Sequence, residues 1–359
     1  CMTWLMAALC SVAVAAPAMA ADTIKIGVQG AHSGDLASYG VPSLNAAKIV
    51  IEEANAKGGV LGKKIELVSQ DDQCKPELAT NAATKLISDK VVAIMGPICS
   101  GATNASLPMY ESANIISISP TATTPALTLE GKHPLFLRTV ANDNAQAQLT
   151  SSYIIEVLKA KKVAYLHDNG EYGKGFAQQN RGILEKAGVE TVLFEAVTPD
   201  AVDFSAVVRK LRRAKADVLI IGYQNTASKL VQQMRRDRVK TPLIGPDGVK
   251  DETFLKMTGK DSEGVMASYP KDTSTLAMYK HAREAHVKQF GSEPGFGYYN
   301  AYAATQALIK AIEVAGSTET DKIMAALKST EVDTPLGKMS FNKAGDATGL
   351  GLSVYVVKD

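Results

Sequence analysis

The sequence has almost no excess of either charge. Its 359 residues include 39 lysines and arginines against 37 aspartates and glutamates, a formal net charge of +2. A nucleic-acid-binding protein would show a marked basic excess or a long basic cluster. The densest basic segment, residues 209–215, follows Val and Leu at helical spacing, which indicates a solvated helix face. We therefore exclude nucleic acid as a partner.

Signatures of catalysis are also absent from the sequence. No serine lies in a G-x-S-x-G turn, and there is no H-E-x-x-H motif. "GGVLGKK", residues 58–64, lacks the spacing and the Ser or Thr of a phosphate loop, and "GEYGKG", residues 170–175, is not G-x-G-x-x-G. Of five histidines, only His32 and His167 follow predicted strands, and neither has a matched nucleophile. We expect a protein that is not an enzyme and has no cofactor.

Cysteine is scarce, and two of the four cysteines lie in a segment typical of export. Residues 1–20 carry no charge and end in Ala-Met-Ala, and their apolar run is short for a membrane span. We predict a signal peptide, residues 1–20, that is cleaved after Ala20. A positively charged start is missing, so we expect the true N-terminus to lie upstream. The alternative is lipid attachment at Cys10, where Leu9 stands in place of the usual small residue.

Cys74 and Cys99 are the two cysteines that remain after cleavage. In an oxidising compartment the simplest fate of two thiols is a disulfide. This bond would close a loop of 25 residues and stabilise the fold by about 3 kcal/mol. A metal site is the weaker interpretation, because neither cysteine belongs to a C-x-x-C pair and no histidine lies near them in sequence.

Short apolar runs alternate with amphipathic stretches along the whole chain. This βαβα order predicts an α/β fold with parallel sheets covered by helices on both faces. One helix is expected in "VPSLNAAKIVIEEANAKGG", with Pro42 in its first turn and Gly58-Gly59 at its end. The strand candidates are residues 24–28, 65–69, 91–95, 115–119, 163–167, 192–196, 218–222 and 265–269.

Two polar joints interrupt this order, at residues 136–148 and 267–275, and the chain ends in a strand-like "LSVYVVKD". Two α/β lobes, with the chain crossing between them, would account for both joints. A ligand cleft between two lobes needs such short hinge segments.

Small polar and aromatic residues recur just after the predicted strands, as in "GPICSGATNAS", "SPTATTP" and "GPDGV". In parallel sheets these loops gather at the carboxyl edges, where open α/β sheets bind ligands. The simpler alternative is that residues 119–124, which are rich in Ser and Thr and are called the hydroxyl run below, form only a polar turn.

The groups in these loops are those that a free amino acid requires. Ser100 opens a predicted helix, where N–H groups and a hydroxyl suit an α-carboxylate, with Thr123 beside it. Asp247 would compensate an α-ammonium, aided by the backbone carbonyl of Thr121 and the hydroxyl of Thr123. Taken singly, Ser100 is equally typical of an ordinary helix N-cap and Asp247 of a turn.

Several segments in fixed order carry a resemblance to a known family. They are "IKIGVQGAHSGDLASYG", "NAKGGVLGKKIELVSQDDQCKPELA", "GPICSG", "SPTATTP", "HDNGEYGKG" and "DTPLGKMSFNKAGD". The chain resembles the type I periplasmic solute-binding proteins of ATP-driven (ABC) transporters, and within them the branched-chain amino acid binders. The family's disulfide stands where Cys74 and Cys99 stand.

The resemblance implies a fold of two Rossmann-like lobes that close like a Venus flytrap about a three-segment hinge. The N-terminal lobe would comprise residues 22–141 and 271–348, and the C-terminal lobe residues 142–270 and 349–359. It further implies a periplasmic monomer that captures a free amino acid of the Leu/Ile/Val class and delivers it to a membrane permease.

The resemblance also assigns residues to the ligand. Ser100 and Thr123 would hold its carboxylate and ammonium groups, and Asp247 would pair with the ammonium. Thr121 and Ala122 would contribute backbone atoms from the N-terminal lobe. The rings of Tyr172 and Tyr223 would close down from the C-terminal lobe. Tyr39 and Phe296 would form walls of the side-chain pocket.

The sequence departs from the family pattern at two of these positions. Asp247 stands where Glu is frequent, so its salt bridge to the ammonium group is expected to be longer or water-mediated. Thr121 stands where Ala is frequent, so the pocket is expected to be narrower. Two alternatives stay open within the same fold. One is a different ligand, such as an aromatic acid, an amide or urea, and the other is a sensory module that signals to a receptor.

Overall fold

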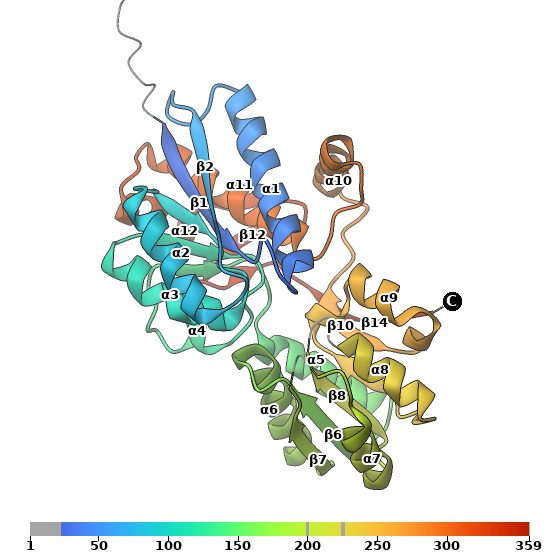
Figure 1. Ribbon diagram of the computed structural model, residues 1–359. Coiled ribbons are helices and arrows are strands. Elements are labelled where there is room, and N and C mark those ends of the chain that lie inside the picture. The colour runs from blue at the N-terminus through green and yellow to red at the C-terminus, as the bar shows by residue number, and fades with distance from the viewer. Residues whose placement is uncertain (1–22, 199–200, 224–226, 359) are drawn as a thin grey trace, which may run out of the picture.

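Two mainly parallel β-sheets form the framework of the protein, as seen in a computed structural model that describes residues 23–198, 201–223 and 227–358 (Figure 1). The predicted signal peptide, residues 1–20, lies outside the described residues. We call the part built on the first sheet the N-terminal lobe and the part built on the second sheet the C-terminal lobe.

The first sheet has five parallel strands in the order β2-β1-β3-β4-β5. Strands β3 and β4 are fully buried, as expected for strands covered on both faces. The strands are β1 Ile24–Gly30, β2 Ile65–Asp71, β3 Ala93–Met95, β4 Ile116–Ser119 and β5 Phe136–Arg138.

The second sheet has the order β14-β10-β9-β8-β6-β7, in which only β14 is antiparallel to its neighbour. Both sheets therefore share one parallel topology, with a point of reversal at β1/β3 and at β6/β8. The strands are β6 Lys162–His167, β7 Glu190–Ala196, β8 Val218–Gly222, β9 Leu243–Gly245, β10 Met266–Pro270 and β14 Leu352–Val356.

All eight strand candidates coincide with strands of these sheets. Strand β9 was not predicted, because its apolar run is only Leu243 and Ile244, between a proline and a glycine. The sequence analysis also missed a small antiparallel sheet of the N-terminal lobe, formed by β11 Val332–Thr334, β12 Gly337–Phe341 and β13 Ala347–Thr348.

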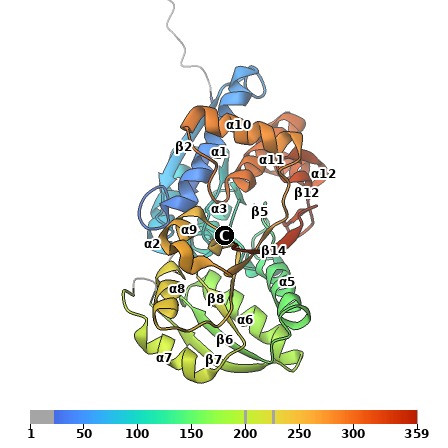
Figure 2. The same cartoon turned by 90° about the vertical axis from the view of Figure 1, so that its right-hand side faces the viewer.

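Helices cover both faces of each sheet (Figures 1 and 2). Those of the N-terminal lobe are α1 Ala37–Ala56, α2 Pro76–Ser88, α3 Ser100–Ser112, α4 Ala126–Leu129, α10 Ala277–Phe290, α11 Tyr298–Ala315 and α12 Thr320–Ser329. Those of the C-terminal lobe are α5 Asp143–Glu156, α6 Glu171–Lys186, α7 Ser205–Ala214, α8 Ala227–Arg236, η1 Asp247–Val249, α9 Glu252–Thr258 and η2 Gly259–Ser262.

The first long helix begins earlier than predicted. α1 covers Ala37–Ala56, so Pro42 lies inside the helix and not in its first turn, and that prediction is wrong. The extra turn packs against the loop after β1 because residue 40 is glycine: a Cβ atom there would lie 1.8 Å from Ala31 O. The end is as predicted, since Gly58 follows the helix with a φ of +104°.

The chain passes between the two sheets three times, in residues 139–142, 271–276 and 349–351. Figure 2 shows α5 and β14 close to the narrow region between the lobes. These connections support the predicted lobe boundaries. Which residues move together as each lobe is a question of motion, so the boundaries stay a prediction.

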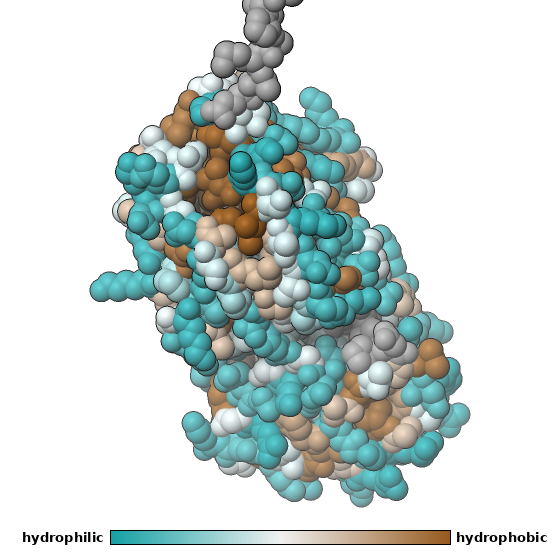
Figure 3. Space-filling view, turned by 60° about the vertical axis from the view of Figure 1, so that its left-hand side comes forward, coloured by the Kyte–Doolittle hydropathy of each residue, from teal (hydrophilic) through white to brown (hydrophobic). Residues whose placement is uncertain are grey.

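On the face shown in Figure 3, hydrophilic side chains cover much of the surface and hydrophobic residues gather mainly on the N-terminal lobe. No helix within the described ranges is both long enough and apolar enough to span a bilayer.

Candidate functional site

A cavity of about 410 Å³ lies between the two lobes, at the points where the strand order reverses. Both lobes contribute to its wall. Six of the nine predicted ligand residues line it, namely Tyr39, Ser100, Thr121, Tyr172, Asp247 and Phe296. The other three, Ala122, Thr123 and Tyr223, are buried beside it and do not line it.

Ser100 is the first residue of α3, and its hydroxyl reaches the cavity from the N-terminal lobe. The N-cap position belongs to Cys99, which makes no side-chain capping bond. The structure therefore does not support the alternative that Ser100 is an ordinary N-cap. Its Oγ accepts the N–H of Thr124 at 3.3 Å, and Gly101 beside it also lines the cavity. The positive end of the α3 dipole thus faces the cavity.

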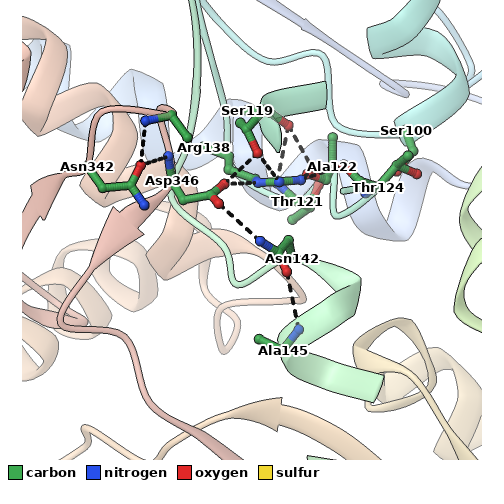
Figure 4. Close-up of polar contacts among 12 residues, drawn as sticks. Ser100, Ser119, Thr121, Ala122, Thr124, Arg138, Asn142, Ala145, Asn342 and Asp346 are labelled. Atoms are coloured by element: carbon green, nitrogen blue, oxygen red, sulfur yellow. Dashed lines mark hydrogen bonds and ion pairs between the residues drawn. The ribbon is translucent and has the colours of Figure 1, made fainter. Parts of the chain in front are cut away.

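The hydroxyl run after β4 has two uses (Figure 4). Ser119 Oγ donates to Pro97 O at 2.5 Å and accepts the N–H of Ala122 at 3.0 Å. Thr121 Oγ1 donates to Ile98 O at 2.6 Å, and Thr121 also lines the cavity. The run is therefore both a tightly bonded turn and part of the cavity wall. We call residues 119–124 the ligand loop.

Asp247 forms the opposite wall, in the C-terminal lobe. It follows β9, is 3% exposed, and accepts the Tyr172 hydroxyl at 2.5 Å and the N–H of Gly248 at 3.0 Å. Burial raises the pKa of Asp247 to about 6, and the hydrogen bonds from Tyr172 and neighbouring groups offset part of that rise.

A second carboxyl group, that of Asp143, lies behind the cavity at the start of α5. It is fully buried and its Oδ2 has no hydrogen-bond partner, while the nearby Thr123 hydroxyl acts to lower its pKa. Burial, followed by the charge of Asp247, raises the pKa of Asp143 to about 8. Gln146 links the two acids, because its Oε1 accepts the N–H of Asp247 at 3.1 Å and its amide contacts Asp143 at 3.4 Å. Sequence reasoning missed Asp143.

The cavity wall is negatively charged. Three carboxylate residues line it, Asp168, Glu171 and Asp247, and its lining includes no Lys, Arg or His in the described part of the chain. Nor do the described residues contain a cluster of His, Cys, Asp and Glu that would hold a metal ion. The wall is therefore suited to a ligand that brings its own positive group.

The rest of the wall is largely apolar. The rings of Tyr39 and Phe296 meet edge to face, with centroids 4.9 Å apart, and Leu36 and Ile98 lie in the same wall. The predicted disulfide between Cys74 and Cys99 is present, with Cα atoms 5.5 Å apart, and also lines the cavity. A ligand with one polar and one apolar end fits these surroundings.

Neither candidate catalytic base reaches the cavity. His32 and His167 are absent from its lining, and burial lowers the pKa of both imidazoles. His167 Nδ1 accepts the N–H of Asn169 at 3.0 Å, so this ring nitrogen is engaged by the loop that follows β6.

Two hydrogen bonds cross the cavity from lobe to lobe. Tyr39 Oη donates to Gly248 O at 2.7 Å, and Asn104 Nδ2 donates to Glu171 Oε1 at 2.8 Å. Both pairs border the cavity, so they form only when the lobes approach each other. The structure is therefore a closed arrangement.

Removing the Asn104 side chain is expected to weaken ligand binding, because its hydrogen bond to Glu171 joins the two lobes. In Asn104→Ala the closed form loses a hydrogen bond to a carboxylate, which we discount to about 1 kcal/mol because Asn104 is exposed, or about fivefold in affinity. Isothermal titration calorimetry measures this change. As a control, Glu171→Gln keeps an acceptor at Oε1 and should lose less than twofold; an unchanged affinity in Asn104→Ala would contradict the role of this bond.

Three comparisons with known proteins agree with this geometry. Residues 23–358 match the family model described as Periplasmic binding protein. The Leucine-, isoleucine-, valine-, threonine-, and alanine-binding protein of Pseudomonas aeruginosa is 32% identical over 352 residues, which cover 98% of this chain and 94% of that protein. The Leu/Ile/Val/Thr-binding protein of Salmonella typhimurium is 33% identical over 336 residues, with coverages of 93% and 91%.

A solved structure is similar over the same length. It is the branched-chain amino acid transporter substrate binding protein of Streptococcus pneumoniae in complex with isoleucine. Its TM-score is 0.83 at 26% identity, and the match covers 93% of this chain and 100% of that one. The predicted α/β fold with two Rossmann-like lobes is thereby confirmed.

Proposed function

The chain belongs to the periplasmic binding protein family, and from this premise we propose that it captures a free branched-chain or other small neutral amino acid between its lobes and delivers it to the permease of an ABC importer. The relatives named for Leu, Ile and Val binding support the ligand class. The cleaved signal peptide predicted at residues 1–20 supports a periplasmic location, and we propose a monomer.

One observation carries the choice of ligand: a buried carboxylate and a helix N-terminus line the same cavity, and the described residues of its wall include no Lys, Arg or His. Asp247 would pair with the α-ammonium group, and the N–H groups at the start of α3, with Ser100 Oγ, would hold the α-carboxylate. An aromatic acid would leave Asp247 buried and unpaired. The aliphatic side chain would lie against Tyr39 and Phe296.

The proposed mechanism is a hinge motion without covalent chemistry. Ligand enters an open form, and its two polar ends bridge Ser100 of one lobe and Asp247 of the other. Because these bonds form together only when the lobes are close, binding energy shifts the equilibrium toward the closed form. The closed form is what the permease recognises in this proposal, and no bond of the ligand is broken.

A thermal-shift screen tests the proposal directly. Residues 21–359, refolded to remove carried-over ligand, are melted with each of the twenty amino acids at about 1 mM. A ligand with micromolar affinity adds about 4 kcal/mol of stability, which should raise the midpoint by about 5 °C. A rise confined to small neutral amino acids, led by Leu, Ile or Val, supports the proposal. No rise with any amino acid contradicts it and directs the screen to aromatic acids, amides and urea.

A further inference from the structure

An ion pair between a fully buried arginine and a partly buried aspartate, far apart in sequence, lies directly behind the ligand loop (Figure 4). Arg138, at the end of β5, is 0% exposed, and its Nε donates to Asp346 Oδ1 at 2.5 Å. Isolating two charges from water costs free energy that their attraction only partly restores, so a buried pair is weak evidence of stabilisation. The other hydrogen-bond partners of Arg138 and Asp346 indicate which segments this ion pair positions.

Arg138 holds the backbone of the ligand loop. Its Nη1 donates to the carbonyl oxygens of Ala122 at 3.2 Å and Thr124 at 2.7 Å. The carbonyl between them, that of Thr123, accepts the N–H of Asp143, the first residue of α5, at 2.9 Å. Three consecutive carbonyl groups are thus fixed from behind, which leaves the other side of the loop for the cavity.

Asp346 extends the same network to the hinge. Its Oδ2 accepts Asn142 Nδ2 at 3.0 Å, and Asn142 is the N-cap of α5, accepting the N–H of Ala145 at 3.2 Å. Asn142 ends the first connection between the sheets, and Asp346 comes just before the third, residues 349–351. A hydrogen bond from Arg138 N to Gly345 O, at 3.0 Å, joins these segments again.

We propose that Arg138 and Asp346 are positioning residues that couple the hinge to the ligand loop, an inference that rests on the proposed binding function. Rotation of the C-terminal lobe carries Asn142 and Asp143 with α5. These residues bond Asp346 and the Thr123 carbonyl, so closure and the binding geometry of residues 121–124 are set together. The loop then adopts its ligand-binding form when the hinge is closed.

Asn142→Asp tests this coupling at a residue outside the cavity lining. An aspartate keeps the N-cap of α5 but replaces the amide donor by an oxygen that repels the Asp346 carboxylate. We expect leucine affinity to fall about tenfold by calorimetry. We also expect amide hydrogen exchange in residues 121–124 of the ligand-free protein to rise by about tenfold, with α5 unchanged.

Two further variants separate coupling from lost stability. Asp251→Ala removes the N-cap of α9 in the C-terminal lobe, where Asp251 Oδ1 accepts the N–H groups of Thr253 and Phe254. It should lower the melting midpoint while leaving leucine affinity and loop exchange unchanged. The double variant Asn142→Asp/Asp346→Asn exchanges the amide and the carboxylate, so it should recover affinity to within about threefold.

The outcomes distinguish this inference from the proposed function. If the native protein binds no amino acid, the proposed function fails, and hydrogen exchange on the ligand-free variants still decides the coupling. The inference is overturned if amide hydrogen exchange in residues 121–124 of Asn142→Asp stays at the rate of the native protein. An equal loss of affinity in Asp251→Ala also overturns it, because that would reflect stability alone.

Discussion

Asp247→Ala is expected to abolish amino acid binding while the protein stays folded. The side chain is 3% exposed and sits in a wall whose described residues include no cation. Removing one partner of a buried charge pair costs about 3–5 kcal/mol, because the ammonium would lose water and gain no compensating charge. Affinity should therefore fall by about two to four orders of magnitude, which calorimetry with leucine measures.

Two matched variants test whether charge is the cause. Asp247→Asn keeps the size of the side chain and an acceptor for Tyr172 but removes the charge, so it should lose nearly as much affinity as Asp247→Ala. Asp168→Asn removes another carboxylate of the same wall, one already bonded to the N–H of Gly170 at 2.9 Å, and should change affinity only severalfold. Near-native leucine binding by Asp247→Ala would show that the ammonium is held elsewhere.

The fold of Asp247→Ala should survive for a reason visible in the native carboxyl group. Because burial raises the pKa of Asp247, its ionised form destabilises the ligand-free protein at neutral pH. Removing it relieves that cost, so the ligand-free melting midpoint should not fall. Loss of binding with an unchanged or higher midpoint separates a binding residue from a structural one.

Sequence patterns predicted the framework because its signals are local. Runs such as residues 218–222 are apolar throughout and flanked by polar loops, so each strand is recognisable within a few residues. Order along the chain then gave the parallel topology. Signals of this kind fail for β9, whose three residues precede Asp247, although the turn "GPDGV" after it was still recognisable.

The charged residues behind the cavity wall could not be predicted from the sequence, for a different reason. Arg138 and Asp346 are 208 residues apart, and nothing near either residue in sequence indicates the other. Asp143 resembles an ordinary acidic residue in the first turn of a helix until the fold buries it near Asp247. An arginine inside the apolar run "LFLRTV" was the one available clue, because a buried guanidinium requires partners.

The start of α1 shows a third limit. Proline is favoured in the first turn of a helix, so Pro42 led to a predicted start at Val41, which is four residues late. The true first turn is fixed by a close approach of Gly40 to Ala31, which is a tertiary contact. This turn carries Tyr39 into the cavity, so the wrong boundary concealed how that ring is placed.

Ligand affinity is expected to fall as pH is lowered through about 6. In the ligand-free protein the pKa of Asp247 is raised to about 6, whereas a bound ammonium group would favour its ionised form. Below pH 6 binding must therefore release a proton, and affinity drops by about tenfold per pH unit. Calorimetry between pH 7 and 4.5 should show a loss of about 30-fold, and a nearly flat profile from pH 7 to 8.

Stability of the ligand-free protein should change in the opposite direction. Asp247 and Asp143 have pKa values raised to about 6 and about 8, so between pH 4 and 8 these two groups bind more protons in the folded state than in the unfolded state. Their contribution to the free energy of unfolding therefore rises as pH falls from 8 toward 4. Burial lowers the pKa of His32 and His167, which acts in the opposite direction, so the measurement is a comparison: lowering the pH from 7.5 to 5 should raise the ligand-free midpoint more, or lower it less, in the native protein than in Asp247→Asn.

These opposite slopes identify the group responsible. General acid damage would lower stability and affinity together, whereas protonation of a buried carboxyl that pairs with the ligand lowers affinity and raises stability. In Asp247→Asn the residual affinity should lose its dependence on pH between 7 and 4.5, while the part of the stability slope due to Asp143 persists. An affinity in the native protein that is constant over this range would mean that no titrating carboxylate pairs with the ligand, and the zwitterion assignment would have to be abandoned.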